Sequence, residues 1–348
     1  MRKKTIGIVT VYDAVDNVGS YLQAYALSRF LAKSNYDARF IRYKPKCLAL
    51  VGLLKRISPI RSLYWRVRIM FSLLRAWSYL NVISAYKASC CDAIIYGSDE
   101  IWNMDNPYFA DPFFFGGGFP SVPKLAYATS VGAMKASTLK KNAGIATHIS
   151  DFRYICVRDE YTKKLLRSRF TVRGIDNESP VCDPTLLIPL EEMEKSDQKF
   201  GEPYLLVYTY GVDERIISHL KRFAKEKGLK LVSAFFWHPW ADKVRCCSPF
   251  EFSHIIRKAD FVFTTTFHGA IFTMRNHKRC AILPARDKVR HVATELGAQK
   301  HIVSGECSYE TFYKTITAPF DSLDFENKLD DWQQRSAETL LTALATYA

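Results

Sequence analysis

The sequence predicts an α/β protein in which two Rossmann-like domains face a cleft. A chain of 348 residues is long enough for two domains, each with a core of its own. Short apolar, β-prone segments alternate with helical patterns before and after a charged, non-periodic stretch at 191–201, the predicted linker. This alternation implies a parallel sheet in each half. A long helical pattern at 322–347 is expected to return to the first domain.

The composition is that of a globular protein with excess positive charge. The 49 lysines and arginines exceed the 35 aspartates and glutamates, which gives a net charge of +14. An anionic partner is therefore expected, whether nucleic acid, acidic lipid or a phosphorylated small molecule. The nine cysteines show no Cys-x-x-Cys spacing, which argues against a disulfide scaffold or a zinc site and favours reduced thiols in the cytoplasm. No metal is expected, and no apolar segment approaches the roughly 20 residues that a membrane-spanning helix needs.

The first element is a strand at 5–12, followed by a polar loop at 13–20 and a helix. The apolar run is too short for a secretion signal and has no cleavage site. The loop has neither the Gly-x-Gly-x-x-Gly fingerprint of a dinucleotide site nor a phosphate-binding loop that ends in Gly-Lys-Ser/Thr. It either makes a tight turn or binds part of a substrate through Asn17, Gly19 and Ser20.

After a second strand at 38–43, a basic helical insertion is predicted at 44–90. No acidic residue occurs between Arg39 and Lys87, whereas arginines and lysines stand among apolar and aromatic side chains. One interpretation is a helix packed on the sheet, with arginines that extend along its surface to water. The other is an interfacial helix that lies on an anionic lipid surface through residues 44–80, with Trp65 and Trp77 at the level of the headgroups.

Two further strands of the first domain end in candidate site residues. The strand at 92–96 is followed by polar and aromatic side chains that suit a sugar, although Trp102 can equally belong to the core. The strand at 154–157 ends at Arg158, which can clamp a carboxylate or phosphate, or pair with an acidic side chain. The sugar candidates are Asp99, Glu100, Trp102 and Asn103. Between these strands we expect a loop at 105–123, a strand at 124–129 and a helix at 134–150.

In the second domain, a histidine follows a strand directly. The triplet Thr264–Thr266 leads the strand at 261–263 into His268 and Gly269, where a helix begins. In an open α/β sheet, ligands bind at the carboxyl ends of the strands, and the N–H groups that open the next helix attract anions. His268 therefore either meets substrate, with Thr266 and Gly269 beside it, or caps the helix. The other expected strands are 204–208, 229–236 and 279–283, and the other helices are 213–227, 249–258 and 288–296.

Five segments, in order along the chain, resemble the motifs of the polysaccharide pyruvyl transferase family. They are Asn17–Leu27, Tyr96–Asn103, Tyr127–Gly132, Val157–Glu160 with Cys182–Thr185, and Phe267–Gly269. The resemblance implies a GT-B type arrangement, which agrees with the two-domain prediction. The predicted boundaries are 1–190 for the first domain, expected on the acceptor side, 202–320 for the second, and 321–348 for the terminal helix.

The resemblance also implies a reaction, the transfer of pyruvate from phosphoenolpyruvate to two hydroxyls of a sugar residue as a ketal. Phosphate is released and no cofactor is needed. His268 is the candidate acid or base, because an imidazole changes protonation near neutral pH. Arg158, Lys288 and Arg290 are candidates for a cationic clamp on the donor. Ser130, within one matched segment, is a candidate substrate contact.

One residue departs from the family pattern. Members that resemble the better-known enzymes often carry Arg-x-His-Gly, whereas Thr266 stands at the place of that arginine here. The anion contact then comes from elsewhere, such as Lys288 or Arg290, or the donor differs.

Two alternative functions stay open from the sequence. One is a GT-B type glycosyltransferase that uses a nucleotide sugar, and the other is a non-catalytic module that binds an anionic polymer. The chain has no recognised nucleic-acid motif, so nucleic acid is not an expected partner. We expect a cytoplasmic enzyme that works at the inner face of the membrane on a lipid-linked glycan precursor.

Overall fold

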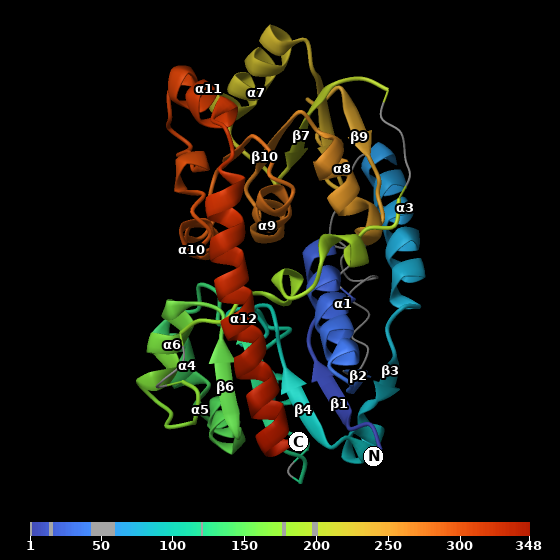
Figure 1. Ribbon diagram of the computed structural model, residues 1–348, viewed down its shortest axis with the longest axis vertical. Helices are drawn as coiled ribbons and strands as arrows, with labels where there is room; N and C mark the ends of the chain where they lie inside the picture. The colour runs from blue at the N-terminus through green and yellow to red at the C-terminus, as the bar shows by residue number, and fades with distance from the viewer. Residues whose placement is uncertain (1, 14–16, 43–59, 120, 176–178, 197–200) are drawn as a thin grey trace.

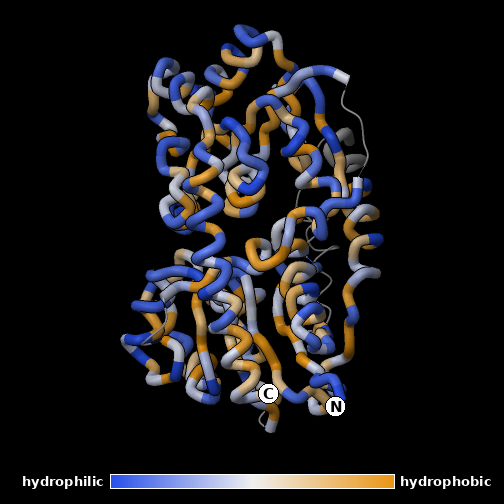
Figure 2. Tube along the Cα trace, viewed as in Figure 1, coloured by the Kyte–Doolittle hydropathy of each residue, from blue (hydrophilic) through white to orange (hydrophobic). Residues whose placement is uncertain are grey.

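Two α/β domains lie one above the other in the computed structural model (Figure 1). The structure describes residues 2–13, 17–42, 60–119, 121–175, 179–196 and 201–348, without the side chains of 60–66. Hydrophobic residues run through the strands inside each domain, whereas hydrophobic and hydrophilic residues alternate along the outer helices (Figure 2). The predicted fold class is confirmed.

The first sheet has six parallel strands in the order β3-β2-β1-β4-β5-β6. β1 pairs with β2 on one side and with β4 on the other, so the strand order reverses at β1. A crevice therefore opens beyond the carboxyl ends of β1 and β4. The strands are β1 (Thr5–Val9), β2 (Asp37–Arg42), β3 (Val82–Ser84), β4 (Ala93–Tyr96), β5 (Lys124–Thr129) and β6 (Tyr154–Val157). The helices are α1 (Val18–Lys33), α3 (Ile60–Trp77), α4 (Ala136–Lys141), α5 (Ala143–Ala146) and α6 (Glu160–Arg167).

The second sheet has five parallel strands in the order β11-β10-β7-β8-β9. Here the order reverses at β7, between β8 and β10, so the carboxyl ends of β7 and β10 border the corresponding crevice. The strands are β7 (Tyr204–Tyr208), β8 (Lys230–Ala234), β9 (Lys243–Arg245), β10 (Phe261–Thr264) and β11 (Cys280–Ile282). The helices are α7 (Glu214–Lys227), α8 (Phe252–Lys258), α9 (Phe267–Arg275), α10 (Asp287–Glu295) and α11 (Tyr309–Thr317).

The last helix, α12 (Ser322–Tyr347), runs from the second domain back along the first (Figure 1). The Trp332 indole N–H donates to the carbonyl of Pro180 at 3.0 Å, and the Ser336 hydroxyl accepts the backbone N–H of Cys182 at 2.9 Å. These contacts satisfy backbone groups of the segment that leads out of the first sheet. The prediction that the terminal helix returns to the first domain is therefore confirmed.

Helix α3 also contacts both domains. The Trp77 indole donates to the carbonyl of Tyr12 in the first domain at 3.0 Å, and the Ser72 hydroxyl donates to the carbonyl of Cys247 in the second at 3.4 Å. Ile69 and Leu73 are buried on the same side of the helix. This face fits the interpretation of a packed helix. The predicted apolar segment at 44–59 and the Trp65 side chain lie outside the described residues, and no described helix is long and apolar enough to cross a membrane.

The structure differs from the sequence prediction in several elements. Strands β3 and β9 and helix α11 were not predicted. The helix expected at 134–150 is instead broken, because Asn142 leaves helical geometry with φ −106° and ψ 30° and its side chain donates to the carbonyl of Thr138. Asparagine favours such local hydrogen bonds over helix continuation. The predicted linker at 191–201 falls between the two sheets in sequence, and its residues 197–200 lie outside the described part.

Candidate functional site

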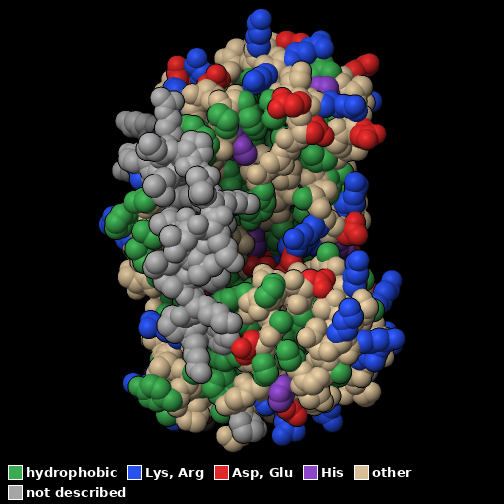
Figure 3. Space-filling model, turned by 180° about the vertical axis from the view of Figure 1, so that it is seen from behind, with side chains coloured by type: hydrophobic (Ala, Val, Ile, Leu, Met, Phe, Trp, Pro, Cys, Tyr) green, Lys and Arg blue, Asp and Glu red, His purple; other side chains and the backbone are tan. Residues whose placement is uncertain are grey.

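A cavity of about 510 Å³ lies between the two domains, where both crevices meet. Figure 3 shows this hollow from behind, with acidic, basic and histidine side chains gathered in it. The first domain lines it with Val11, Asn17, Ser20, Asp99, Glu100, Asn106, Tyr108 and Phe109. The second domain lines it with Tyr208, Tyr210, Thr265, Thr266, Phe267, His268, Ala285, Arg286, Lys288 and Val289.

His268 is held at the start of α9 by the threonines before it. Thr264 donates to the carbonyl of Tyr208 at 2.8 Å, which ties the end of β10 to β7. Thr266 is the N-cap, and its hydroxyl accepts the backbone N–H of Gly269 at 3.0 Å. A side chain at Gly269 would place its Cβ 2.2 Å from the Thr264 hydroxyl, so only glycine fits. Gly269 thus serves the turn that presents His268 to the cavity.

Gly19 packs directly against the imidazole of His268. A Cβ at this position would lie 2.0 Å from Nδ1, so the start of α1 reaches the ring only because residue 19 is glycine. Asn17 caps the helix by accepting the backbone N–H of Ser20 at 3.2 Å. The predicted substrate-binding loop therefore brings Asn17 and Ser20 to the cavity, whereas Gly19 makes a contact between the domains.

A buried carboxylate of the first domain faces His268. Asp183 Oδ2 lies 3.6 Å from His268 Nε2, an ion-pair distance that is too long for a hydrogen bond. The same oxygen accepts from Arg158 Nη1 at 2.9 Å, while Oδ1 accepts the backbone N–H and hydroxyl of Thr185. Burial alone would raise the pKa of Asp183, but His268 and Arg158 lower it far below its ordinary value. Asp183 was missed as a site residue, although it lies in a matched segment.

Arg158 is buried beneath the cavity and does not line it. Its side chain is 2% exposed, pairs with Asp183, and reaches 3.7 Å from Asp99. The guanidinium also stacks 4.5 Å from the ring centroid of Phe267. Burial would lower the pKa of Arg158, but Asp183 and Asp99 raise it. The acid-pairing alternative is the one found, because carboxylates surround the side chain, and the predicted clamp on the donor stays a prediction.

Asp99 links this buried cluster to the cavity. Its Oδ2 accepts from the Ser20 hydroxyl at 2.8 Å, and both residues line the cavity. Burial would raise the pKa of Asp99, but the charges of Arg158 and Lys288 lower it below its ordinary value. The cavity therefore contains an ionised carboxylate at neutral pH.

Glu100 joins the domains through two cations of the second domain. It accepts from Arg286 Nη1 at 2.5 and 2.6 Å and from Lys288 Nζ at 2.7 Å. Burial would raise the pKa of Glu100, but Lys288 and Arg286 lower it to about 2. Sequence reasoning missed Arg286 because it lies just before the predicted helix. Glu100 and Lys288 are both at the cavity, as predicted.

Besides Gly19 and Gly269, four other predicted substrate contacts do not line the cavity. Trp102 is fully buried, donates to the carbonyl of Phe114 at 2.8 Å and stacks near Phe115, so it belongs to the core. Ser130 is buried, and its hydroxyl accepts the N–H of Gly132. Asn103 donates a hydrogen bond to Glu100 at 3.2 Å, and Glu100 in turn lines the cavity. Arg290 is exposed on α10 outside the cavity lining. For Trp102 the core alternative is the one found, and the substrate contacts of the other three residues stay predictions.

The described residues contain no group of three or more histidine, cysteine, aspartate or glutamate side chains arranged to hold a metal ion. Within that part of the chain, His268 Nε2 has no hydrogen-bond partner. This nitrogen is itself buried and directed at Asp183, but the His268 side chain lines the cavity, and an imidazole there can donate a proton to a ligand or accept one from it. Lys288 and Arg286 can hold an anion on the same wall. The arrangement thus suits acid-base chemistry on an anionic substrate.

A family model, polysaccharide pyruvyl transferase, matches residues 17–285. The chain belongs to the polysaccharide pyruvyl transferase family. This is a transferase family of polysaccharide biosynthesis, so the chain is assigned to the transferases. The matched residues include His268 and the buried acids, and they end at Ala285, just before the two cations at the cavity. No curated protein matches the sequence.

Solved structures similar to this pyruvyl transferase family member share its GT-B type fold. A putative UDP-N-acetylglucosamine 2-epimerase from Listeria monocytogenes aligns with a TM-score of 0.53 at 11% identity, over 99% of this chain and 96% of that one. UDP-GlcNAc 2-epimerase from Neisseria meningitidis, bound to UDP-GlcNAc, gives 0.53 at 10%, over 99% and 100%. The glycosyltransferase SnogD from Streptomyces nogalater gives 0.50 at 11%, over all of both chains. At these identities the likeness shows the fold alone.

The Glu100 ion pairs predict a specific pH dependence of stability. A carboxylate whose folded pKa is lowered from 4.5 to about 2 stabilises the fold fully above pH 4.5, and loses that contribution as the pH falls. We expect the free energy of unfolding of the wild type to fall more steeply than that of Glu100→Gln below about pH 5, by up to about 3 kcal/mol in total. Urea unfolding at a series of pH values measures this difference.

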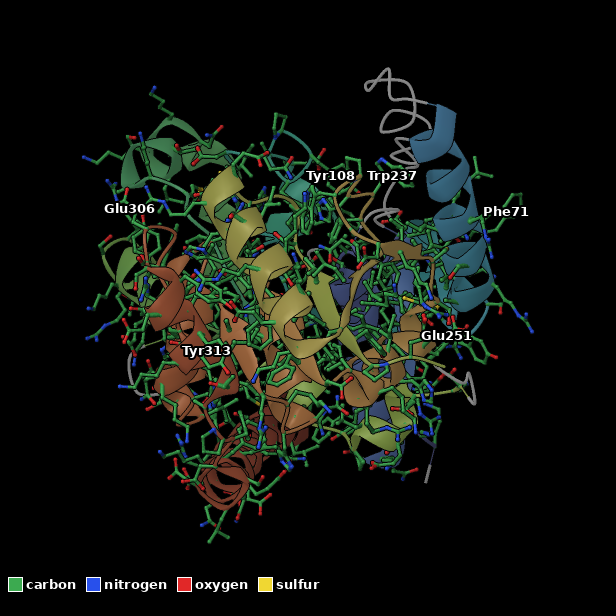
Figure 4. All side chains as sticks on the ribbon, turned by 90° about the horizontal axis from the view of Figure 1, so that it is seen from above. Phe71, Tyr108, Trp237, Glu251, Glu306 and Tyr313 are labelled. Atoms are coloured by element: carbon green, nitrogen blue, oxygen red, sulfur yellow. The ribbon has the colours of Figure 1, made fainter. Side chains whose placement is uncertain are left out.

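The matched control is Glu306→Gln, an exposed glutamate of the second domain that Figure 4 labels. For this variant, the free energy of unfolding should fall with decreasing pH as steeply as it does for the wild type. Parallel curves for the wild type and Glu100→Gln would show that the ion pairs contribute nothing to stability.

Proposed function

We propose that the protein transfers pyruvate from phosphoenolpyruvate to two hydroxyls of one sugar residue, forming a cyclic ketal and releasing phosphate. The observation that carries this proposal is that His268, Lys288 and Arg286, all from the second domain, line the same cavity. A trianionic enol phosphate needs both a proton donor and cations. Family membership supports the same reaction, and phosphoenolpyruvate serves as substrate with no cofactor.

The reaction balances without an oxidant or reductant. The methylene carbon of phosphoenolpyruvate takes a proton and becomes a methyl group, while one sugar hydroxyl forms a bond to the adjacent carbon. The C–O bond to phosphate then breaks, and the second hydroxyl closes the ketal ring. Of the two hydroxyl protons, one replaces the proton consumed at the methyl group and the other leaves with phosphate. His268 is the proposed carrier of these protons.

Donor binding requires that Glu100 release its two partners. In the structure, the Glu100 carboxylate accepts hydrogen bonds from Arg286 and Lys288, two cations that line the cavity. A carboxylate or phosphate of the donor can take its place when the domains separate slightly, with more charge than the single carboxylate it displaces. Asp183 and Arg158 stay beneath, where they position His268 and do not touch the donor.

We further propose that the acceptor is a lipid-linked glycan at the cytoplasmic face of a membrane. The outer side of α3 carries Phe71, 63% exposed, and Leu74, 43% exposed, next to Arg75. Figure 4 shows Phe71 pointing away from both domains. Exposed apolar side chains beside a cation suit the headgroup region of anionic lipid. Because α3 contacts both domains, this face would hold the cleft close to a membrane-anchored acceptor.

His268 is tested by replacing it with alanine. We expect the rate of phosphate release from phosphoenolpyruvate, measured with a panel of glycan acceptors, to fall about a hundredfold or more, because proton transfer is lost. His148→Ala, a histidine outside the cavity, should turn over like the wild type. Circular dichroism confirms that both variants are folded. An active His268→Ala enzyme would end the proposed mechanism.

Lys288 and Arg290 lie on the same helix, so alanine substitutions of the two residues can be compared directly. We expect Lys288→Ala to weaken phosphoenolpyruvate binding about tenfold or more, since a hydrogen bond between charged groups is lost, while Arg290→Ala binds normally. Isothermal titration calorimetry in the absence of an acceptor measures the phosphoenolpyruvate affinity of both variants. Equal effects of the two substitutions would contradict the assigned donor site. Binding of nucleotide sugars in place of phosphoenolpyruvate would favour a glycosyltransferase.

Membrane attachment is tested with vesicles of phosphatidylcholine, with and without phosphatidylglycerol. The wild type should sediment with the anionic vesicles at low salt, and a Phe71→Glu, Leu74→Glu, Arg75→Glu variant should bind about tenfold less or weaker still. Lys221→Glu, Lys225→Glu on α7 changes the net charge by the same amount and should retain binding. If it loses binding equally, the attraction is non-specific; if the wild type ignores anionic vesicles, the acceptor is soluble.

A further inference from the structure

A basic surface of the first domain has no part in the site described above. It is formed by the residue that begins α4, the last turns of α4 and α6, and the segment after α6. Figure 3 shows basic side chains gathered below and to the right of the hollow, on the side of the molecule where α4 and α6 lie. Five exposed cations define what we call the α4–α6 basic surface: Lys135, Lys140, Lys141, Lys164 and Arg169.

The acidic residues of this region do not neutralise the α4–α6 basic surface. Asp159 is buried as the N-cap of α6, where it accepts the backbone N–H of Thr162 at 2.7 Å. Asp151 lies 3.7 Å from His148, and Glu160 lies in the first turn of α6. Within the described part of the chain, none of the five cations forms an ion pair. Such a concentration of one charge on a surface attracts polyanions.

The α4–α6 basic surface begins close to the cavity. Gly132 packs against the carboxylate of Glu100, so tightly that a Cβ at this position would lie 2.3 Å from the carboxylate oxygen. Lys135, the N-cap of α4, follows three residues later. Because Glu100 lines the cavity, the segment 132–135 leads directly from the cavity to the first cation of the surface.

Two further contacts hold α4 and α6 at this edge of the cavity. The Thr138 hydroxyl of α4 donates to Asp105 at 2.7 Å, and the next residue, Asn106, lines the cavity. The Tyr161 hydroxyl of α6 donates to the carbonyl of Met134 at 2.6 Å, just before α4. A ligand chain that leaves the cavity along this edge therefore reaches α4, and then α6 beside it.

The α4–α6 basic surface and α3 lie on opposite sides of the molecule (Figure 1). Helix α3 leads into β3 at one edge of the first sheet, whereas α6 follows β6 at the other edge. Large apolar side chains are exposed on α3, at Phe71 and Leu74. On α4 and α6, Tyr161 is the one exposed large apolar residue among those described. This surface is thus charged and not amphipathic, which favours a soluble polyanion over a lipid bilayer.

We propose that the α4–α6 basic surface binds the part of an acidic glycan that extends beyond the cavity, through carboxylates on its sugar residues. This inference rests on the proposed function. The carboxylate of phosphoenolpyruvate takes no part in the bonds that form and break, so each ketal adds a negative charge to the glycan. A glycan that already carries ketals is therefore a polyanion, and lysine and arginine side chains bind its carboxylates. The surface would hold such a chain while another of its sugar residues occupies the cavity.

Isothermal titration calorimetry with two hexasaccharides, anionic hexagalacturonate and neutral maltohexaose, tests the surface without phosphoenolpyruvate. We expect hexagalacturonate to bind more tightly than maltohexaose, and to lose affinity as salt is added, because exposed charges are screened. A Lys140→Gln, Lys141→Gln, Lys164→Gln variant should bind hexagalacturonate about tenfold more weakly, since three exposed charge contacts are lost together. The control variant removes three exposed lysines of the second domain and should bind as the wild type does: Lys221→Gln, Lys225→Gln, Lys314→Gln. Thermal unfolding verifies that both variants are folded.

Several results would overturn this inference. Equal affinities for the two hexasaccharides, or equal losses in the two variants, would show that the surface does not recognise an acidic glycan. If hexagalacturonate does not bind, but a single-stranded oligonucleotide or phosphatidylglycerol vesicles bind through the same three lysines, the surface serves a nucleic acid or a membrane instead.

Titration with phosphoenolpyruvate separates this inference from the proposed function. The Lys140→Gln, Lys141→Gln, Lys164→Gln variant should bind phosphoenolpyruvate like the wild type, because Arg286 and Lys288 are unchanged. If hexagalacturonate fails to bind to a wild type that binds and consumes phosphoenolpyruvate, the surface is wrong and the proposed function stands. If the wild type does not bind phosphoenolpyruvate, the proposed function is overturned.

Discussion

The site depends on one buried cation, Arg158, and the carboxylates around it. Arg158 follows β6, Asp99 follows β4, and Asp183 lies on the segment that leads out of the first sheet, so their pairing fixes three chain segments at one point. A buried ion pair gives little net stability, but removing one partner leaves an uncompensated charge that costs several kcal/mol. Asp183 then faces His268 across the domain boundary. The first domain thus orients the histidine that we propose as the acid or base, which the second domain supplies.

The same boundary is closed by contacts of very different character. Gly19 against the His268 ring is a steric fit that admits no side chain, whereas Glu100 against Arg286 and Lys288 is electrostatic and can be exchanged for another anion. Helix α12 makes a third contact, because it runs along both domains (Figure 1). Steric and helical contacts can therefore serve as a pivot while the ion pairs open. An anionic donor that replaces a carboxylate on the same cations keeps their charges satisfied during that motion.

The sequence predicted the alternation of strands and helices, the strand ends that carry site residues and the role of α12, because these follow from local periodicity and turn residues. It missed β3 and β9, which have only three residues each and are not fully buried, so neither periodicity nor composition marks them. Side-chain partners were the least predictable, since pairs such as Arg158 with Asp183 depend on packing between distant segments. Lys288 and Arg290 illustrate why the sequence alone could not identify the side chains that reach the cavity. Two residues apart on a helix, they point about 200° away from each other, so only one can face the cavity.

Thr266 illustrates how one position can serve local structure in place of substrate binding. Its hydroxyl accepts the backbone N–H of Gly269 and so caps the helix that carries His268. An arginine, found at this place in members that resemble the better-known enzymes, has donors only and could not make that bond. A threonine therefore strengthens the helix start, while the cavity gives up one cation at that point. Arg286, the residue before α10, and Lys288, in the first turn of α10, supply two cations on the same domain as His268. The proposed donor contact and the helix cap are thus carried by different segments, which allows each to be altered without loss of the other.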